Sequence, residues 1–299
     1  MHTEALDWLE HYQTHLREQR QLSPHTLSNY RRDLCAAVSW CDKQDVDEWH
    51  DLDSQRVRLW SAECHRKGLG GRSIQRRLSV LRGFCQFLVR YKVLEHNPVN
   101  DIRAPKSPHK LPHSLDVDRL QRLLECKPDN WLEQRDLSMM ELLYSGGLRL
   151  AELVNLDIND IDLREGEARV LGKGNKTRIV PVGRKARAAI THWLPVRKLY
   201  AKEDESALFI SRSGSRICPR SVQQRLRRWA LKQGLESRLY PHALRHSCAT
   251  HVLESSGDLR AVQELLGHAN LSTTQIYTHL DFQHLAQVYD AAHPRARKK

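Results

Sequence analysis

The sequence predicts a mainly α-helical chain with one small β-sheet, divided into two domains. Apolar residues recur at helical spacing over most of the 299 residues. A basic, proline-rich segment at 104–112 interrupts this pattern, and two short β-type runs flank a glycine-rich turn in the second half. We therefore expect a helical domain at 1–103, a linker at 104–112, and a second domain at 113–299.

The first domain is expected to contain four consecutive helices. The first helix carries apolar residues on one face at Ala5, Leu9, Tyr12 and Leu16. Ser23 followed by Pro24 is typical of an N-cap with proline at the first helical position, and Asp53 can cap a third helix. The fourth helix follows the glycine cluster at 68–71. Four helices joined by short loops predict a bundle.

The polar faces of these helices are rich in arginine. The set comprises Arg31, Arg32, Arg72, Arg76, Arg77, Arg82 and Arg90. Any one of them could be an ordinary solvated residue, but several have no acidic residue nearby in sequence, so the group favours a surface that faces the DNA backbone. The whole chain has 48 Lys and Arg against 36 Asp and Glu, a net charge of +12, which attracts polyanions. Basic ribosomal factors and membrane-surface proteins share this signature.

Cysteine usage and hydropathy point to a cytoplasmic protein without a membrane partner. The 7 cysteines are scattered without CxxC pairing, which fits a reducing compartment and neither a disulfide framework nor a zinc ribbon. The first residues lack an apolar segment of signal-peptide length, and no stretch approaches the ~20 apolar residues that span a bilayer.

The second domain is expected to combine helices with a β-hairpin. Helical periodicity covers 117–126, 136–144, 151–156, 185–200, 221–235, 242–254, 259–266 and 282–292. Ala168–Leu171 and Arg178–Val182 are β-type runs on either side of Gly172–Lys176, which is typical of a hairpin turn. The domain is therefore predicted to be α+β.

Candidate chemistry lies in four segments of this domain. Its residues are Arg149, Lys173, His242, Arg245, His268 and Tyr277. Taken singly, each has an ordinary structural interpretation: Arg149 could pair with Glu152, and Lys173 could be a solvated turn residue. His242 and His246 have the spacing of metal ligands, but the Glu of a zincin motif is absent. No Walker-type loop is present either, so we expect neither a metal nor another cofactor.

Taken in order, these residues resemble the tyrosine recombinases, also called phage-integrase-type recombinases, and especially the Xer group that resolves chromosome dimers. The resemblance covers both domains and rests on the strings SPHTLSNYRRDL, YSGGLRLAELVNL, GKGNKTRIVPV, PHALRHSCATH, LLGHANLSTTQIYTHLD and FQHLAQVYDAAHPRARKK. One departure is Ala151, where relatives often have Ser. The resemblance implies a core-binding (SAM-like) first domain and a catalytic second domain, which together form a C-shaped DNA clamp.

The resemblance also implies a role for each candidate residue. Tyr277 is the nucleophile, which forms a 3′-phosphotyrosyl link and frees a 5′-hydroxyl. Negative charge builds up on the phosphate during attack, and without a metal it needs fixed cations, here Arg149 and Arg245. Lys173 is implied to protonate the leaving 5′-oxygen. His242 is implied to accept a proton or to hydrogen-bond the phosphate, and His268 to donate to a non-bridging oxygen.

The assembly implied by the resemblance acts on double-stranded DNA with a specific recombination site. Two protomers of this chain and two of an XerD-like recombinase form a heterotetramer, which works through a Holliday junction under the control of a septal DNA translocase. The C-terminal helix at 282–292 is implied to exchange between protomers, although such helices usually pack on their own domain. Two alternatives stay open: a DNA-binding protein without catalysis, and a type IB topoisomerase.

Overall fold

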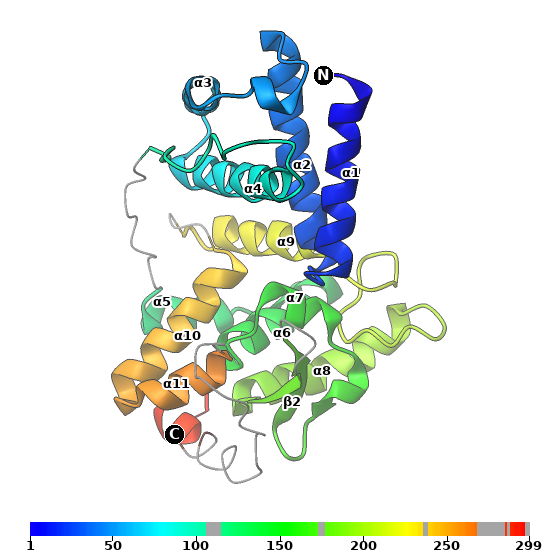
Figure 1. The fold of residues 1–299 in the computed structure, drawn as a ribbon. Helices are drawn as coiled ribbons and strands as arrows, with labels where there is room; N and C mark the ends of the chain where they lie inside the picture. The colour runs from blue at the N-terminus through cyan, green and yellow to red at the C-terminus, as the bar shows by residue number, and fades with distance from the viewer. Residues whose placement is uncertain (106–114, 173–176, 236–238, 268–284, 286–287, 297–299) are drawn as a thin grey trace. The chain divides into compact units, whose positions relative to one another are not determined.

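The computed structural model describes residues 1–105, 115–172, 177–235, 239–267, 285 and 288–296 (Figure 1). Contacts divide the chain into two compact units, Met1–Lys110 and Leu111–Lys299. Most of the predicted linker at 104–112 lies outside the described residues, so its bounds and those of the two predicted domains stay predictions.

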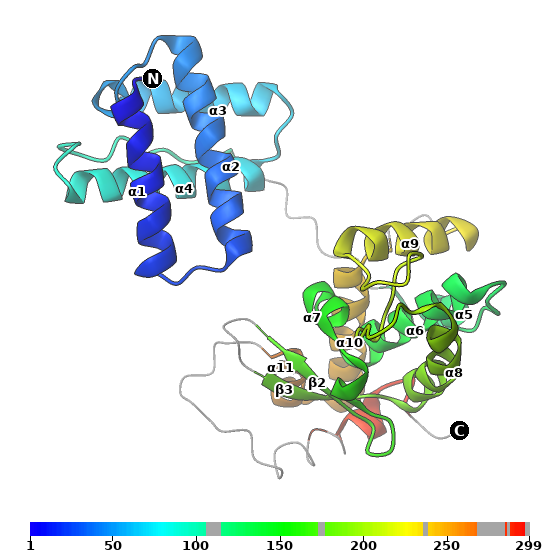
Figure 2. The same cartoon turned by 90° about the vertical axis from the view of Figure 1, so that its right-hand side faces the viewer.

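The first unit is helical, as predicted. Within residues 1–105 its elements are α1 (Thr3–Glu18), α2 (Pro24–Cys41), the 3-10 turns η1 (Asp42–Gln44) and η2 (Trp49–Asp51), α3 (Ser54–Arg66) and α4 (Gly71–Arg90). Helices α1 and α2 run side by side, and α4 crosses them (Figures 1 and 2). Phe84, Cys85 and Leu88 of α4 are fully buried and form the centre of the bundle.

Both predicted N-caps of this unit are confirmed. The Ser23 hydroxyl accepts a hydrogen bond from the Thr26 amide at 3.3 Å, and Pro24 opens α2. The Asp53 carboxylate accepts from the Arg56 amide at 2.7 Å. Each cap satisfies a backbone donor that the first turn of a helix leaves free, so the sequence fixes where these two helices begin.

Three of the arginines expected to face DNA also contact other groups within the bundle. Arg76 lies 2.7 Å and Arg77 lies 3.7 Å from the carboxylate of Asp33, which is buried on α2. Arg82 donates to the carbonyls of Val99 and Ile102 at 3.0 and 2.9 Å. The acidic partner of Arg76 and Arg77 is distant in sequence and close in space, so the residues that neighbour these arginines in sequence do not reveal it.

The other arginines of the set keep their charge at the surface. Arg31 pairs with Glu10 at 3.3 Å, but both side chains are about two-thirds exposed, so water screens the pair. Arg32, Arg72 and Arg90 are exposed and form no ion pair with any residue in the described part of the chain; Arg32 donates to the Asn29 side-chain amide at 2.6 Å. They are the members of the set that are free to meet a phosphate.

The second unit combines helices with a three-stranded sheet. Its described elements are α5 (Val117–Leu124), α6 (Trp131–Ser145), α7 (Leu150–Asn155), η3 (Ile158–Asp160), β1 (Ile161–Asp162), β2 (Glu167–Leu171), β3 (Thr177–Pro181), α8 (Arg184–Tyr200), α9 (Pro219–Lys232), α10 (Pro241–Ser256) and α11 (Leu259–Leu266). The strands are antiparallel in the order β1-β2-β3, with Leu171 paired to Thr177 next to the turn. The predicted hairpin is confirmed, whereas β1 was not expected because two residues give no alternating pattern.

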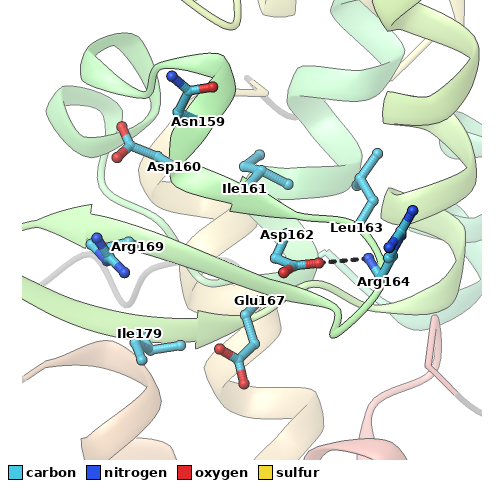
Figure 3. A pocket seen from close by; sticks show the side chains of 9 residues that line it. All are labelled: Asn159, Asp160, Ile161, Asp162, Leu163, Arg164, Glu167, Arg169 and Ile179. Atoms are coloured by element: carbon cyan, nitrogen blue, oxygen red, sulfur yellow. Dashed lines mark hydrogen bonds between the residues drawn. The ribbon is translucent and has the colours of Figure 1, made fainter.

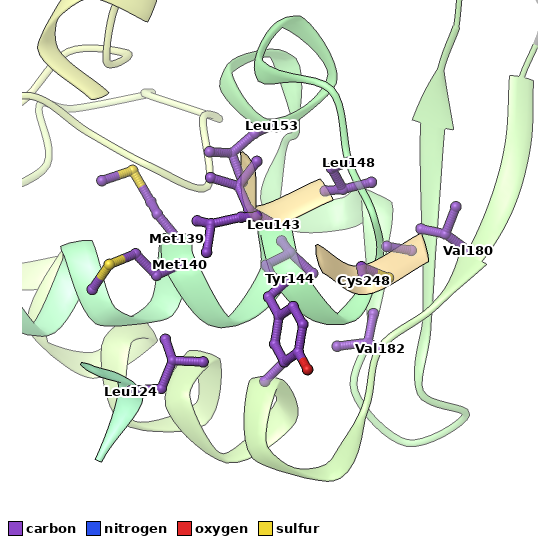
Figure 4. Packing of buried hydrophobic residues seen from close by; sticks show 14 of the residues in the cluster. Leu124, Met139, Met140, Leu143, Tyr144, Leu148, Leu153, Val180, Val182 and Cys248 are labelled. Atoms are coloured by element: carbon purple, nitrogen blue, oxygen red, sulfur yellow. The ribbon is translucent and has the colours of Figure 1, made fainter. Parts of the chain in front are cut away.

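Helix α6 is the centre of this unit (Figure 4). Met139, Met140, Leu143 and Tyr144 are buried along it, and side chains from the sheet and from α10 pack around them. The sequence placed its start too late, at residue 136, because the buried Arg135–Asp136 ion pair interrupts the apolar period. The helix begins at Trp131, where Asn130 caps the Glu133 amide at 3.1 Å.

The described part of the C-terminal segment packs on its own unit. Residues 288–292 are helical, and Tyr289 and His293 are buried beside Tyr144 of α6. Arg295 is buried and forms an ion pair with Glu141, its Nε lying 3.2 Å from one carboxylate oxygen. In the single chain this segment is therefore part of the core. Its predicted exchange between protomers concerns an assembly and stays a prediction.

Across the described residues, no helix is both long and apolar enough to cross a membrane.

Candidate active site

Arg149 is positioned by the first turn of α7. It is the N-cap residue, and its amide donates to Glu152 Oε2 at 2.8 Å while its Nη1 donates to Glu152 Oε1 at 2.8 Å. The simple interpretation of Arg149 as a partner of Glu152 is therefore correct for the contact. It is incomplete for the residue, because the Arg149 side chain stays 38% exposed while the Glu152 side chain is 2% exposed.

Arg245 lies in the second turn of α10 and is buried. Its Nη1 donates to the Gly147 carbonyl, and its Nη2 donates to the Leu266 carbonyl at 2.6 Å. Arg149 Nη2 donates to the next carbonyl, that of Gly267, at 3.2 Å. Two consecutive carbonyls at the end of α11 thus orient both guanidinium groups, and the partial negative charge of a helix C-terminus favours cations there.

These contacts leave donors for a ligand. A guanidinium carries five N–H groups, and Arg149 and Arg245 use two groups each in the contacts described. Planar forks of this kind match the oxygens of a phosphate. The two predicted arginines are therefore brought together with donors to spare.

The charges of the site favour an anion. Burial, and then the nearby charge of Arg149, lower the pKa of Arg245 to about 10, so it stays protonated at neutral pH. Burial alone would raise the pKa of Glu152, but hydrogen bonds from Arg178 and Arg149 lower it to about 2. One carboxylate thus faces three guanidinium groups, which leaves an excess of positive charge where a phosphate would bind.

His242 lies on the same helix as Arg245, three residues earlier and therefore on the same side. Its side chain is exposed at the start of α10, so it is accessible to a substrate. His246 is partly buried one turn later. In the part of the chain that the structure describes, no group of three His, Cys, Asp or Glu side chains could hold a metal ion.

The other three predicted residues lie outside the described part of the chain. Lys173 belongs to the segment between β2 and β3, His268 follows Gly267 in the sequence, and Tyr277 comes nine residues later. The elements beside them do converge: β3 contacts α7 through Arg178 and Glu152, and the end of α11 contacts Arg149. The roles of these three residues stay predictions.

Sequence reasoning missed Arg178. It is 7% exposed, and its Nη1 and Nη2 donate to Glu152 Oε1 and Oε2 at 2.6 and 2.9 Å. A signal for it existed in the strand pattern. Side chains alternate between the two faces of a strand, so the inward apolar position of Val180 places Arg178 inward as well. A charged residue at an inward position is informative because it needs a partner.

A hollow of about 580 Å³ lies on the other face of the sheet (Figure 3). Arg169 and Ile179, which are paired across β2 and β3, line it together with residues of the β1 region. Asp162 at its edge accepts a hydrogen bond from the Arg164 amide at 2.8 Å. Because Arg178 and Val170 point the opposite way into the core, this hollow is separate from the arginine site.

Family comparison agrees with this geometry. The phage integrase family matches residues 113–284, and the N-terminal SAM-like domain of phage integrases matches residues 9–92. Tyrosine recombinase XerC of Shigella flexneri and that of Escherichia coli O157:H7 are each 52% identical over 298 residues, covering 100% of this chain and 98% of theirs.

Solved structures share the fold. A Tn1549 transposon integrase in complex with circular intermediate DNA has a TM-score of 0.71 at 18% identity, covering 93% of this chain and 98% of that one. The XerH site-specific recombinase bound to palindromic difH substrate has a TM-score of 0.70 at 23% identity, covering 94% and 83%. The full-length identity to XerC carries the assignment further: the chain belongs to the phage integrase family of tyrosine recombinases, DNA recombinases that use a tyrosine nucleophile.

Proposed function

We propose that this recombinase is of the XerC type and cuts and rejoins DNA at a specific site through Tyr277. The tyrosine oxygen attacks the scissile phosphorus, the bond to the 5′-oxygen breaks, and a 3′-phosphotyrosyl link remains. Lys173 supplies the proton to the leaving oxygen, and His242 accepts the phenol proton or hydrogen-bonds the phosphate. The reverse attack by a 5′-hydroxyl rejoins the strand, so the reaction consumes no ATP.

The observation that carries this proposal is a pair of hydrogen bonds. Arg149 donates to the Gly267 carbonyl, and Arg245 donates to the Leu266 carbonyl. Attack adds negative charge to the non-bridging oxygens, and fixed guanidinium groups stabilise that charge without reorganising during the step. Gly267, whose carbonyl accepts from Arg149, immediately precedes His268 in the sequence. This supports a role for His268 as a further donor to the same phosphate.

Two exposed surfaces support DNA binding. In the first unit, Arg72 and Arg90 present unpaired charge. In the second unit, α9 exposes Arg220, Gln223, Gln224 and Arg227, while Arg225 and Trp229 on its inner side bond to buried Asp136 of α6. Arginine and glutamine side chains can read base edges as well as contact phosphates, so a helix with this exposed face suits the major groove. We propose that the two units together form the C-shaped clamp on DNA.

The assembly is proposed from the relatives named XerC. It contains two copies of this chain and two of an XerD-like recombinase, and it acts in the cytoplasm on chromosome dimers at cell division. One pair of strands is exchanged to give a Holliday junction, and the partner exchanges the second pair. A septal DNA translocase regulates the switch. In this assembly the C-terminal segment that packs on its own unit here is exchanged between protomers.

The experiment uses a nicked suicide duplex that carries a candidate site from a chromosome terminus. Cleavage releases a short fragment, so the covalent complex accumulates and migrates slowly on a denaturing gel. Tyr277→Phe should bind the duplex and form no adduct. Tyr240→Phe is the matched control, because this exposed tyrosine belongs to the same unit. Wild-type adduct yield from Tyr277→Phe would contradict the proposal.

Strand exchange tests the assembly. Two intact sites are incubated with this chain alone, with an XerD-like recombinase alone, and with both proteins. Junctions are expected with both proteins. Relaxation of plasmids that lack any site, without recombinant product, would favour a topoisomerase.

A further inference from the structure

Arg178 is the third guanidinium of the active site, and its environment differs from that of Arg149 and Arg245. It lies on β3, is 7% exposed, and forms a bidentate ion pair with Glu152. Its position therefore keeps it from touching a DNA phosphate directly. Its contacts run instead to the carboxylate that also holds Arg149.

Glu152 connects the two arginines. Its Oε1 accepts from Arg178 Nη1 at 2.6 Å and from Arg149 Nη1 at 2.8 Å. Its Oε2 accepts from Arg178 Nη2 at 2.9 Å and from the Arg149 amide at 2.8 Å. Each carboxylate oxygen is thus shared between the two residues, so Arg178 limits how strongly Glu152 can bind the Arg149 guanidinium.

Arg178 also supports the end of α11. A Cβ placed on Gly267 would lie 2.9 Å from both Cδ and Nε of Arg178, so the glycine backbone rests directly on this side chain. The carbonyl of Gly267 is the acceptor for Arg149 Nη2. The same arginine therefore contacts both groups that orient Arg149, namely Glu152 and residue 267.

We propose that Arg178 is a positioning residue for strand cleavage, which acts by holding Glu152 and the end of α11 in the places that aim Arg149 at the phosphate. Without Arg178, Arg149 is the remaining guanidinium that hydrogen-bonds the buried Glu152 carboxylate. The Arg149 fork then turns toward Glu152 and away from the substrate. A buried carboxylate that has lost one partner binds the other more closely, because unpaired burial of charge is costly.

This inference rests on the proposed role of Arg149. The experiment measures single-turnover cleavage of the suicide duplex at saturating protein, and separately the affinity for uncleavable DNA. Arg178→Gln should slow cleavage by about 10- to 100-fold, since a small misplacement of a catalytic group has effects of that size, while the affinity changes less than about twofold. Arg178→Lys, which can satisfy one carboxylate oxygen, should fall between Arg178→Gln and wild type.

A double-mutant cycle separates positioning from a general structural role. Arg178→Gln is combined with Arg149→Ala, and adduct is followed for hours on labelled DNA so that slow variants remain measurable. In the Arg149→Ala background, Arg178→Gln should slow cleavage little further, because the residue that Arg178 positions is absent. Arg197→Gln is the control: Arg197 is equally buried and donates to the Ala207 carbonyl at 2.7 Å, outside the arginine site.

Each result decides the question. Slower cleavage with unchanged affinity and a less than additive double variant supports the inference. Additive effects, an unchanged cleavage rate, or a loss of affinity that matches the loss of rate overturns it. If Arg178→Gln does not fold, Arg178→Lys is carried through the same cycle. Full cleavage by Arg149→Ala alone would instead contradict the proposed site.

Discussion

Arg149 and Arg245 are anchored on neighbouring residues: the Gly267 carbonyl accepts from one, at 3.2 Å, and the Leu266 carbonyl from the other, at 2.6 Å. They come from different helices, separated by nearly a hundred residues of sequence, so the end of α11 fixes their spacing. Changes at this helix end should therefore alter catalysis without touching either arginine.

Gly267→Ala should reduce cleavage by at least tenfold. The new Cβ would lie 2.9 Å from Arg178, and the backbone at φ +61° is strained for any L side chain. Gly257→Ala is the matched control, because it has φ +66° and nothing within 4 Å of a Cβ. Gly257→Ala should lose about 1 kcal/mol of stability from the left-handed backbone alone, and Gly267→Ala should lose more, because its Cβ would also meet Arg178. Equal cleavage rates in the two variants would contradict the contact with Arg178. Thermal unfolding and single-turnover cleavage are the measurements.

The Glu141–Arg295 ion pair should anchor the C-terminal segment. Both side chains are buried, so Arg295→Gln leaves the Glu141 charge unpaired and should cost about 3–5 kcal/mol of unfolding free energy. Glu141→Gln should cost less, because Arg295 also lies 3.6 Å from the carboxylate of Glu125. The double variant Glu141→Gln with Arg295→Gln should be more stable than the sum of the two losses predicts. Urea unfolding of the four proteins gives the coupling. Strict additivity would mean that the segment is not held by this pair.

Stability should fall as the pH drops below about 6.5, and His293 should account for part of the loss. Burial lowers the pKa of His293 to about 3 in the folded chain, whereas the unfolded histidine titrates near its usual 6.5. Between these values the unfolded chain binds the extra proton, so the stabilisation is complete above pH 6.5 and is lost as the pH falls toward 3. From pH 7 to pH 5 the loss from this group amounts to about 2 kcal/mol.

His293→Phe, which keeps a flat ring beside Tyr144 and Tyr289, should remove that part of the pH dependence. The control is His192→Phe, since His192 is exposed. Urea unfolding at pH 7 and pH 5 provides the comparison. If the change in unfolding free energy between pH 7 and pH 5 is the same in His293→Phe as in wild type, His293 is not a buried neutral group.

Arg72→Ala should weaken DNA binding mainly at low salt. Arg72 is exposed and pairs with no carboxylate among the described residues, so its charge is available to a phosphate. Losing one such contact lowers the slope of log affinity against log salt by about 0.9. Arg82→Ala is the control, because Arg82 belongs to the same unit, is partly buried, and donates to the carbonyls of Val99 and Ile102 at 3.0 and 2.9 Å. Gel shifts at several salt concentrations measure both slopes, and equal slopes would remove Arg72 from the DNA surface.

Local patterns predicted most of the fold. Ser23 and Asp53 mark helix starts through caps that involve residues three positions away, and Leu259–Leu266 coincides with α11. The predictions that failed concerned residues whose role depends on contacts that the local sequence does not show. Asp33 neutralises Arg76 and Arg77 from another helix, and the buried Arg135–Asp136 pair hid the start of α6.

The residues of the candidate site also fall into two groups: those that sequence motifs predict, and one whose role only its contacts reveal. Arg149, His242 and Arg245 could be selected from their order in the chain, and the structure brings Arg149 and Arg245 to the same helix end. The strand alternation places Arg178 inward, but its positioning role could not be predicted, because that role depends on contacts with Glu152 and with a glycine nearly ninety residues later. A catalytic group can be recognised by residue type and motif, whereas the residue that positions it is defined by contacts.

The most direct test of the account identifies the amino acid that carries the DNA. Adduct from the suicide duplex is digested with nuclease and trypsin, and mass spectrometry locates the residual nucleotide. We expect a single modified site at Tyr277, and we expect Arg149→Ala and Arg245→Ala to form neither this modification nor the adduct. A nucleotide on any other residue, or full adduct yield without both arginines, would contradict it.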